Sequence, residues 1–328
     1  VASNVQARTT GFTAMGVVAD DGGVATVTHV QINTEGDRSS GLYAIVEQVG
    51  AQFPATISAT RATVQTQGVS AHGASAQARN DAAGETAQVN LASSTIQTQG
   101  LGAIGLRALL ANYGSSPTGR GRAAVVASDT TVSTSGSGAH GVLSRDAPTS
   151  VSIARGSVQT IGVAAHGAVA QIGGFVSGID TRIAASGTDA MALYVVGIPG
   201  AASAMEFSGT TLANASGPLI GIAGNGTLAL TDSTGNADGQ WLRVGTVDDF
   251  PLLASPGPRI LGPADLPDDD GNIPVVDVPE VPDAPIGAAA GDASLTLTRS
   301  TVTGSAFTAP GSVSRLVLVD STWFMTGD

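Results

Sequence analysis

The fold of this chain can be read from the stretch Val64-Gln65-Thr66-Gln67-Gly68-Val69-Ser70-Ala71-His72-Gly73. Its pattern, Val/Ile-x-Thr-x-Gly-x-x-Ala-x-Gly, returns with constant internal spacing and with variable gaps between the copies. The copies start at Ala7, Ile32, Val64, Ile96, Val132 and Val158, with a degraded copy at Ile183 and a looser one near Leu212. Fixed units joined by gaps of free length are typical of a solenoid, in which each unit buries its apolar face against the next.

Each copy predicts two short strands around a turn. Residues 64–68 alternate between two faces, as a strand does, and we expect Gly68 to take a left-handed or strained backbone that only Gly adopts at low cost. A third strand is visible between copies, for example over residues 86–91 and 150–154. Three strands per unit predict an all-β parallel β-helix, a rod of roughly 50 Å in which equivalent residues stack about 4.8 Å apart.

The composition fits a thin, layered core. Aromatic residues make up 4% of the 328 residues and charged residues 12%, while Gly occurs 44 times and Lys is absent. Small and β-branched side chains fill such a core well. A net charge of −12 argues against nucleic acid and anionic lipid as partners. The lack of Cys suits a chain that crosses a bacterial envelope unfolded.

Two segments interrupt the repeat. Residues 113–124 form an inserted loop, and residues 248–286 hold nine of the 15 prolines together with many acids, which excludes a central strand there. Strand patterns resume over 287–328 and stop without a cap. We therefore expect one β-helical domain over 1–328, with motif rungs over 1–247, and a natural protein that continues past Asp328.

A family resemblance rests on these repeats and on the closing stretch Leu316-Val317-Leu318-Val319-Asp320-Ser321-Thr322-Trp323-Phe324-Met325-Thr326. Together they resemble the pertactin-like passenger domains of Gram-negative autotransporters. The resemblance implies a right-handed, single-stranded β-helix that is exported through the periplasm and outer membrane. It also implies that the final rungs and the C-terminal translocator barrel lie outside this chain. The sequence has neither an Arg-Gly-Asp tripeptide nor the Gly-Asp-Ser-Gly motif of the proteolytic members.

Three histidines share one position of the repeat. His72, His140 and His166 are each ninth in their copy, so the register places His140 and His166 on adjacent rungs about 5 Å apart. That spacing would allow a shared metal or proton. A metal site needs three or more convergent ligands, however, and the column holds no carboxylate. A half-exposed column in which His stacks on apolar neighbours is therefore favoured.

The acidic loop is the other candidate site. Asp268, Asp270 and Asn272 could supply hard oxygen ligands to calcium around Gly271. The bidentate Glu and the flanking helices of a calcium loop are missing, which favours a solvated acidic loop. As partner-binding residues we predict three aspartates and two arginines of the two inserted loops: Asp268, Asp269, Asp270, Arg120 and Arg122.

The remaining acids give no sign of catalysis. Asp20-Asp21-Gly22-Gly23 predicts a tight turn. The other carboxylates are expected to be scattered among loops, whereas glycoside cleavage needs two carboxylates about 5 to 9 Å apart on a rigid face. We therefore expect no enzyme activity, no catalytic residue and no cofactor.

The resulting hypothesis is an adhesin that is displayed on the cell surface or released, and that binds through loops on a rigid rod. Its partner would be a host-cell or matrix protein or a surface glycan, with self-association between cells as a further case. A carbohydrate-active β-helix enzyme, of the lyase or glycosidase type, is the alternative and would need acids and arginines converging in one cleft. An inert stalk is the third.

Overall fold

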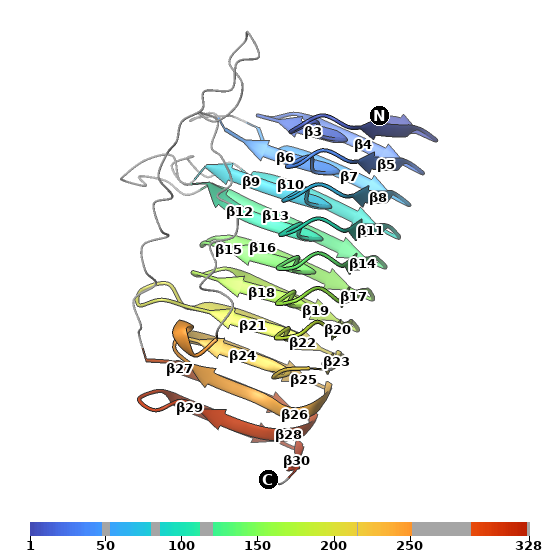
Figure 1. The fold of residues 1–328 in the computed structure, drawn as a ribbon. Coiled ribbons are helices and arrows are strands. Elements are labelled where there is room, and N and C mark those ends of the chain that lie inside the picture. Colours follow the sequence, from blue (N-terminus) through green and yellow to red (C-terminus); the bar gives the residue numbers. More distant parts are fainter. Residues whose placement is uncertain (48–52, 80–85, 112–120, 215, 251–289, 327–328) are drawn as a thin grey trace.

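The structure, a computed structural model, describes residues 1–47, 53–79, 86–111, 121–214, 216–250 and 290–326. The chain coils into a parallel β-helix, and each rung lies on the one before it from the N-terminal to the C-terminal end (Figure 1). The predicted all-β solenoid is confirmed. The described residues contain one short 3-10 helix, η1 (Val247–Asp249), and no helix that is long and apolar enough to cross a membrane.

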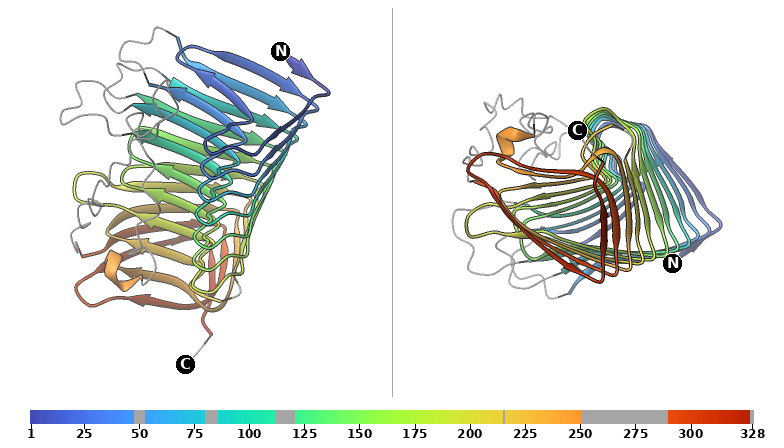
Figure 2. Two further views of the ribbon diagram at one scale, coloured as in Figure 1. Left: turned by 45° about the horizontal axis from the view of Figure 1, so that its top comes forward. Right: turned by 90° about the horizontal axis from the view of Figure 1, so that it is seen from below.

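The rungs have three faces, which the view along the axis shows as three sides of the coil (Figure 2). Face A is a parallel sheet of 11 strands, one for each rung of the described chain. Its strands are β1 (Ala2–Ser3), β4 (Val24–Thr28), β7 (Ala55–Thr60), β10 (Thr86–Ala92), β13 (Arg122–Ser128), β16 (Thr149–Ala154), β19 (Phe175–Ile179), β22 (Ser203–Ser208), β25 (Asn225–Thr231), β27 (Asp292–Thr298) and β29 (Val313–Val319).

Faces B and C carry the two strands of each motif. Face B consists of β2 (Gln6–Thr9), β5 (Gln31–Thr34), β8 (Thr63–Thr66), β11 (Thr95–Thr98), β14 (Thr131–Thr134), β17 (Ser157–Thr160), β20 (Arg182–Ala185), β23 (Thr211–Asn214) and β30 (Thr322–Phe324). Face C consists of β3 (Val17–Asp20), β6 (Leu42–Val46), β9 (Ala74–Arg79), β12 (Leu106–Ala111), β15 (Val142–Arg145), β18 (Ala168–Gln171), β21 (Leu193–Val196) and β24 (Ile220–Ala223).

The ninth and tenth rungs depart from the predicted three strands. There β26 (Thr234–Gly245) and β28 (Thr301–Thr308) run through faces B and C without the turn that separates them elsewhere. Their pairing slips after Asn236, and Trp241 fills the interior beside the bend. The reason is local: neither strand contains the motif that makes the turn.

Equivalent residues lie in single file, as the repeat predicts. Thr98 pairs with Thr66 on one side and with Thr134 on the other, and Thr134 pairs with Thr160. Each threonine hydroxyl donates to the carbonyl five residues later, for example from Thr66 to Ala71 at 2.5 Å. The bond closes the turn between faces B and C, hereafter the turn corner, and satisfies a buried carbonyl.

The motif glycines have a different role from the predicted one. Gly68 is not among the residues with positive φ; the left-handed position lies two residues later and is held by Arg38, Ser70 and Ala164 in three of the rungs. A Cβ on Gly68 would lie 2.0 Å from the carbonyl oxygen of Gly36, one rung earlier. The first glycine is required because stacked backbones meet there, not because of its own dihedral angle.

The second motif glycine makes room for a branched side chain. A Cβ on Gly73 would lie 2.1 Å from Cγ2 of Ile96, which begins the next copy. The same contact recurs between Gly141 and Val158 at 2.2 Å. Where Ala192 replaces this glycine, the next copy begins with Leu212, whose Cβ carries no branch.

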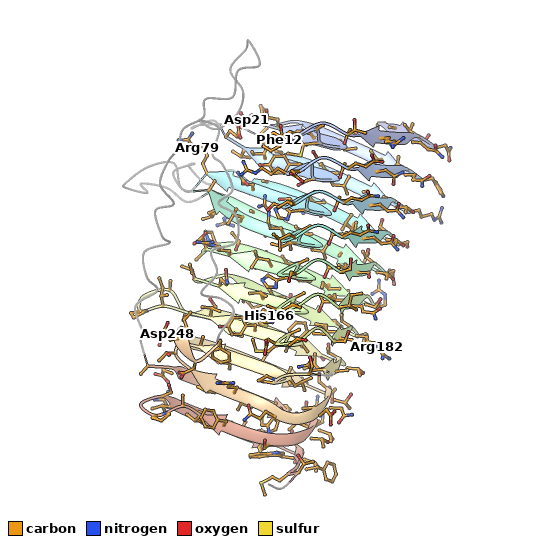
Figure 3. The ribbon with its side chains drawn as sticks, viewed as in Figure 1. Phe12, Asp21, Arg79, His166, Arg182 and Asp248 are labelled. Carbon is orange, nitrogen blue, oxygen red and sulfur yellow. The ribbon has the colours of Figure 1, made fainter. Side chains whose placement is uncertain are left out.

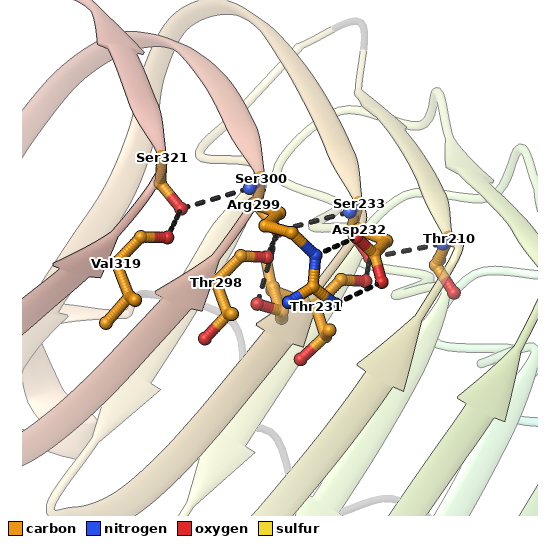
Figure 4. A network of polar contacts seen from close by, with 10 residues as sticks. Thr210, Thr231, Asp232, Ser233, Thr298, Arg299, Ser300, Val319 and Ser321 are labelled. Atoms are coloured by element: carbon orange, nitrogen blue, oxygen red, sulfur yellow. Dashed lines mark hydrogen bonds and ion pairs between the residues drawn. The ribbon is translucent and has the colours of Figure 1, made fainter.

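The corner between faces A and B has a constant length of two residues. In every described rung the first of them has positive φ and is exposed, and we call this position the left-handed corner. Its occupants are Asn4, His29, Arg61, Ser93, Asp129, Arg155, Asp180, Gly209, Asp232, Arg299 and Asp320. Figure 4 shows how the second residue ties rungs together: the hydroxyls of Ser233, Ser300 and Ser321 accept backbone N–H groups of the rung before.

Candidate functional site

All large differences in length fall at the third corner, between faces C and A. One residue, Gly224, connects β24 to β25, whereas residues 246–291 connect β26 to β27. The connections that contain residues 48–52, 80–85 and 112–120 lie at the same corner. We call it the loop corner. Because the other two corners are held by stacking contacts, additional chain is accommodated at this edge of the rod.

The structure changes the bounds of the two predicted loops, residues 113–124 and 248–286. Arg122 belongs to strand β13, where it pairs with Thr86 and faces solvent, because residues 122–128 continue face A. Of the segment 248–286, Asp248 and Asp249 belong to η1 and Phe250 is buried. Arg120 and residues 251–289, with Asp268, Asp269, Asp270 and Asn272, lie outside the described residues, so their predicted roles stay predictions.

A second apolar cluster lies outside the coil, on the outer side of face C. Phe250 follows η1 and packs on Tyr194 with ring centroids 5.1 Å apart. The buried members of the cluster are Ile104, Leu143, Val169, Met191, Tyr194, Val196, Ala223 and Phe250. The start of the longest loop-corner connection is therefore fixed to the rod by aromatic packing.

The histidine column meets this cluster. The rings of His140 and His166 stack at 5.0 Å with an interplanar angle of 7°, and Tyr194 follows at 4.9 Å from His166. Figure 3 labels His166, which lies between β17 and β18. The predicted register is confirmed, but the predicted half-exposure is wrong for two of the three, because His72 and His166 are 4% and 2% exposed.

Each histidine accepts a hydrogen bond from the next rung. Nδ1 of His72 accepts the N–H of Ile104 at 3.0 Å, and Nδ1 of His140 accepts the N–H of His166 at 3.1 Å. Met15 fills the same position in the first rung, and its sulfur accepts the N–H of Ser40. An accepting Nδ1 is unprotonated, so these imidazoles are neutral with the proton on Nε2.

Burial fixes this protonation state. Desolvation lowers the pKa of His140 from 6.5 to about 4. Burial also holds the pKa of His72 and His166 well below the ordinary value, with nearby Arg107 and His140 lowering them further. With Nδ1 engaged by backbone and the rings parallel, His140 and His166 do not converge on a shared metal or proton. Their role here is to join rungs.

Arg107 is an unusual buried cation on face C. It is 2% exposed, and its Nε donates to Ser75 Oγ at 2.9 Å while Nη2 donates to Gln77 Oε1 at 3.2 Å. Nη1 has no hydrogen-bond partner within the described chain. Desolvation lowers the pKa of Arg107 to about 10. Nothing in the sequence indicated this burial, because an outward strand position normally faces solvent.

Three carboxylates, those of Asp20, Asp21 and Glu47, come together at the loop corner of the first two rungs. Asp20-Asp21-Gly22-Gly23 forms the predicted tight turn, with Gly23 N–H donating to the Asp20 carbonyl at 2.8 Å. The backbone of Glu47 then donates to Asp21 Oδ1 at 2.8 Å. Partial burial and the neighbouring carboxylates raise the pKa of Asp20 and Glu47. Arg79, from the third rung, counters this effect at Glu47.

These groups do not make a metal centre. No set of three or more His, Asp or Glu side chains in the described part of the chain is placed to hold a metal ion. The predicted calcium residues fall outside that part. In comparisons with known proteins, no protein-family model matches the chain and no curated protein matches it.

Proposed function

We propose that this chain is the β-helical passenger of an autotransporter-type protein and that it works as an adhesin at the bacterial surface. The observation that carries the proposal is the concentration of length variation at the loop corner. The left-handed corner keeps one length in every described rung and the turn corner keeps one length in the first seven, so the loop corner is the edge that takes long insertions. Binding residues are commonly found on such loops held by a rigid scaffold.

The remaining architecture supports the same function. A stack of 11 rungs at about 4.8 Å gives a rod roughly 50 Å long, which holds its loops at fixed mutual spacing. The partner is a host-cell or matrix protein or a surface glycan, and self-association between cells is the further case. The resemblance of the closing stretch 316–326 to pertactin-like passengers supports export to the surface.

The test is an attachment assay with cells that display the protein. One variant replaces residues 251–289 with a short Gly-Ser linker and keeps Phe250 on Tyr194. The matched control shortens a described connection at the same corner, residues 197–202, to a single glycine like Gly224. Loss of attachment in the first variant alone supports the proposal. Full attachment by both variants contradicts a role for the longest connection.

The enzyme alternative has one observation in its favour, the gathering of Asp20, Asp21 and Glu47 with raised pKa at two of them. A raised carboxyl pKa suits a general acid. Incubating the purified chain with a panel of polysaccharides and measuring new reducing ends tests it. Release that disappears in Glu47→Gln supports the enzyme, and no release from any polymer removes it.

A further inference from the structure

The left-handed corner contains three arginines in different surroundings. Arg155 clamps Asp129 of the preceding rung, with Nε and Nη2 donating to the two carboxylate oxygens at 2.9 Å each. Arg299 clamps Asp232 in the same way at 2.7 Å and 2.7 Å. In both pairs the carboxylate is bound by the edge of the guanidinium that carries Nε and Nη2. Such bidentate pairing is the strongest geometry in which an arginine binds a carboxylate.

Arg61 holds the same position without a carboxylate. The preceding rung offers His29, whose Nε2 accepts from Arg61 Nη1 at 3.1 Å, and the following rung offers Ser93. The Nε–Nη2 edge, which Arg155 and Arg299 use, makes no hydrogen bond to any residue that the structure describes. Both Arg61 and His29 are exposed, so this edge is open to a ligand.

An open groove at this corner has Arg61 in its lining. Its polar lining comes from the first three rungs and comprises Asn4, Gln6, His29, Gln31, Arg61 and Thr63. The lining contains no acid, in a chain whose net charge is −12. Amide and hydroxyl groups both donate and accept hydrogen bonds, which matches the hydroxyls of a sugar.

We propose that this groove binds an acidic polysaccharide, with a uronate carboxylate held by the Nε–Nη2 edge of Arg61. The ligand carboxylate pairs with this edge as Asp129 pairs with that of Arg155, while His29 keeps the corner position of the preceding rung. The amides of Asn4, Gln6 and Gln31 bind hydroxyls of the same and neighbouring sugars. The amide-rich lining without acids favours a sugar over an acidic peptide, and a peptide polyanion is included in the test as the competing ligand.

This proposal names a ligand for the proposed adhesin and rests on that function. Binding of the polysaccharide is measured separately, on the purified full chain. The probes are alginate, alginate with its carboxylates esterified, and poly-glutamate, each immobilised for biolayer interferometry. We expect alginate to bind and the esterified polymer to bind at least about tenfold more weakly, because the charge-assisted pair is lost.

Three variants decide the site. Arg61→Gln is expected to weaken alginate binding by about tenfold or more. Arg182→Gln is the matched control, because Arg182 is an exposed arginine of β20 outside the groove, and it should bind as the unmodified chain does (Figure 3). His29→Asp rebuilds the pair seen at Asp129 and Arg155, so it should abolish binding while Arg61 stays in place.

Circular dichroism and the thermal midpoint check that each variant is folded. Equal losses in Arg61→Gln and Arg182→Gln, or full binding by His29→Asp, would overturn the site. Binding of poly-glutamate as tight as that of alginate would overturn the assignment to a sugar. If alginate fails to bind while the attachment assay still depends on residues 251–289, the groove is not a polysaccharide site and the adhesive function stands.

Discussion

The turn corner and the left-handed corner both redirect the chain within one rung, but they tolerate very different sequences. At the left-handed corner, one exposed position with positive φ accepts Asn, His, Arg, Ser, Asp or Gly. At the turn corner, Gly36, Gly68 and Gly100 recur although none of them has positive φ. Glycine is thus required where neighbouring rungs touch, and a left-handed backbone alone does not require it.

The strongest destabilisation should come from breaking that contact. In Gly100→Ala the new Cβ would lie 1.8 Å from the carbonyl oxygen of Gly68, a backbone atom that cannot move without displacing its rung. We expect the free energy of unfolding to fall by about 3 kcal/mol or more. Gly209→Asn is the control, because Asn4 holds the same corner, and its cost should stay below about 1 kcal/mol. Urea denaturation followed by circular dichroism measures both, and equal losses would contradict the comparison.

Low pH should lower the free energy of unfolding through the buried histidines of the turn corner. The pKa of His140 is about 4 in the folded chain and takes the ordinary value of 6.5 in the unfolded chain, so the unfolded chain binds more protons between these values. Stability is therefore full above pH 6.5 and is lost as the pH falls towards 4, by about 3 kcal/mol for this group alone. His140→Met keeps the column, as Met15 does, and removes the titration.

The measurement is the urea midpoint of both chains at several pH values in that window. The unmodified chain should lose stability more steeply than His140→Met as the pH falls. Parallel curves for the unmodified chain and His140→Met would show that the buried imidazole does not link stability to pH.

A smaller effect tests the threonine bond of the turn corner. In the seventh rung Ala185 replaces the threonine, and Asn214 of the eighth rung donates to both Ala190 O and Pro218 O at 2.9 Å. Asn214→Thr should leave Ala190 O unsatisfied and cost about 1–3 kcal/mol. Adding Ala185→Thr should restore most of the loss, because its hydroxyl reaches the carbonyl five residues later.

The double-mutant cycle of these two positions is read by urea denaturation. A favourable coupling between the substitutions Ala185→Thr and Asn214→Thr is expected, whereas independent, additive effects would mean that Asn214 does not serve both rungs. At the left-handed corner the hydroxyl of the second residue donates instead to the carbonyl two residues earlier in the same rung, for example from Ser233 to Thr231 at 2.8 Å.

The weakest effect belongs to the left-handed corner. Asp129→Asn removes the carboxylate clamped by Arg155, but both side chains are largely exposed, so solvent and salt screen the pair. The urea midpoint should change little, and any change should vanish in high salt. A salt-resistant loss comparable to that of Gly100→Ala would show that this corner too is held by specific contacts.

Part of the site was predictable from the sequence. The register that stacks His140 on His166 follows from constant spacing within the motif. The sequence analysis did not identify the left-handed corner. The position lies three residues before the start of each copy of the motif, and the Asp and Arg residues that recur there could have indicated it. The gathering of Asp20 and Glu47 could not be read from the sequence, because the gap between these rungs has free length.

The β-helix, its rung register and its three-strand unit follow from the amino-acid sequence alone, because a motif of fixed spacing can bury its apolar side only by stacking on its own copies. Which contacts require each glycine, why the imidazoles are neutral, and where Arg61 differs from Arg155 became clear only in the folded chain. These properties depend on the atoms that the neighbouring rung brings within a few ångströms, and those atoms come from residues far away in the chain.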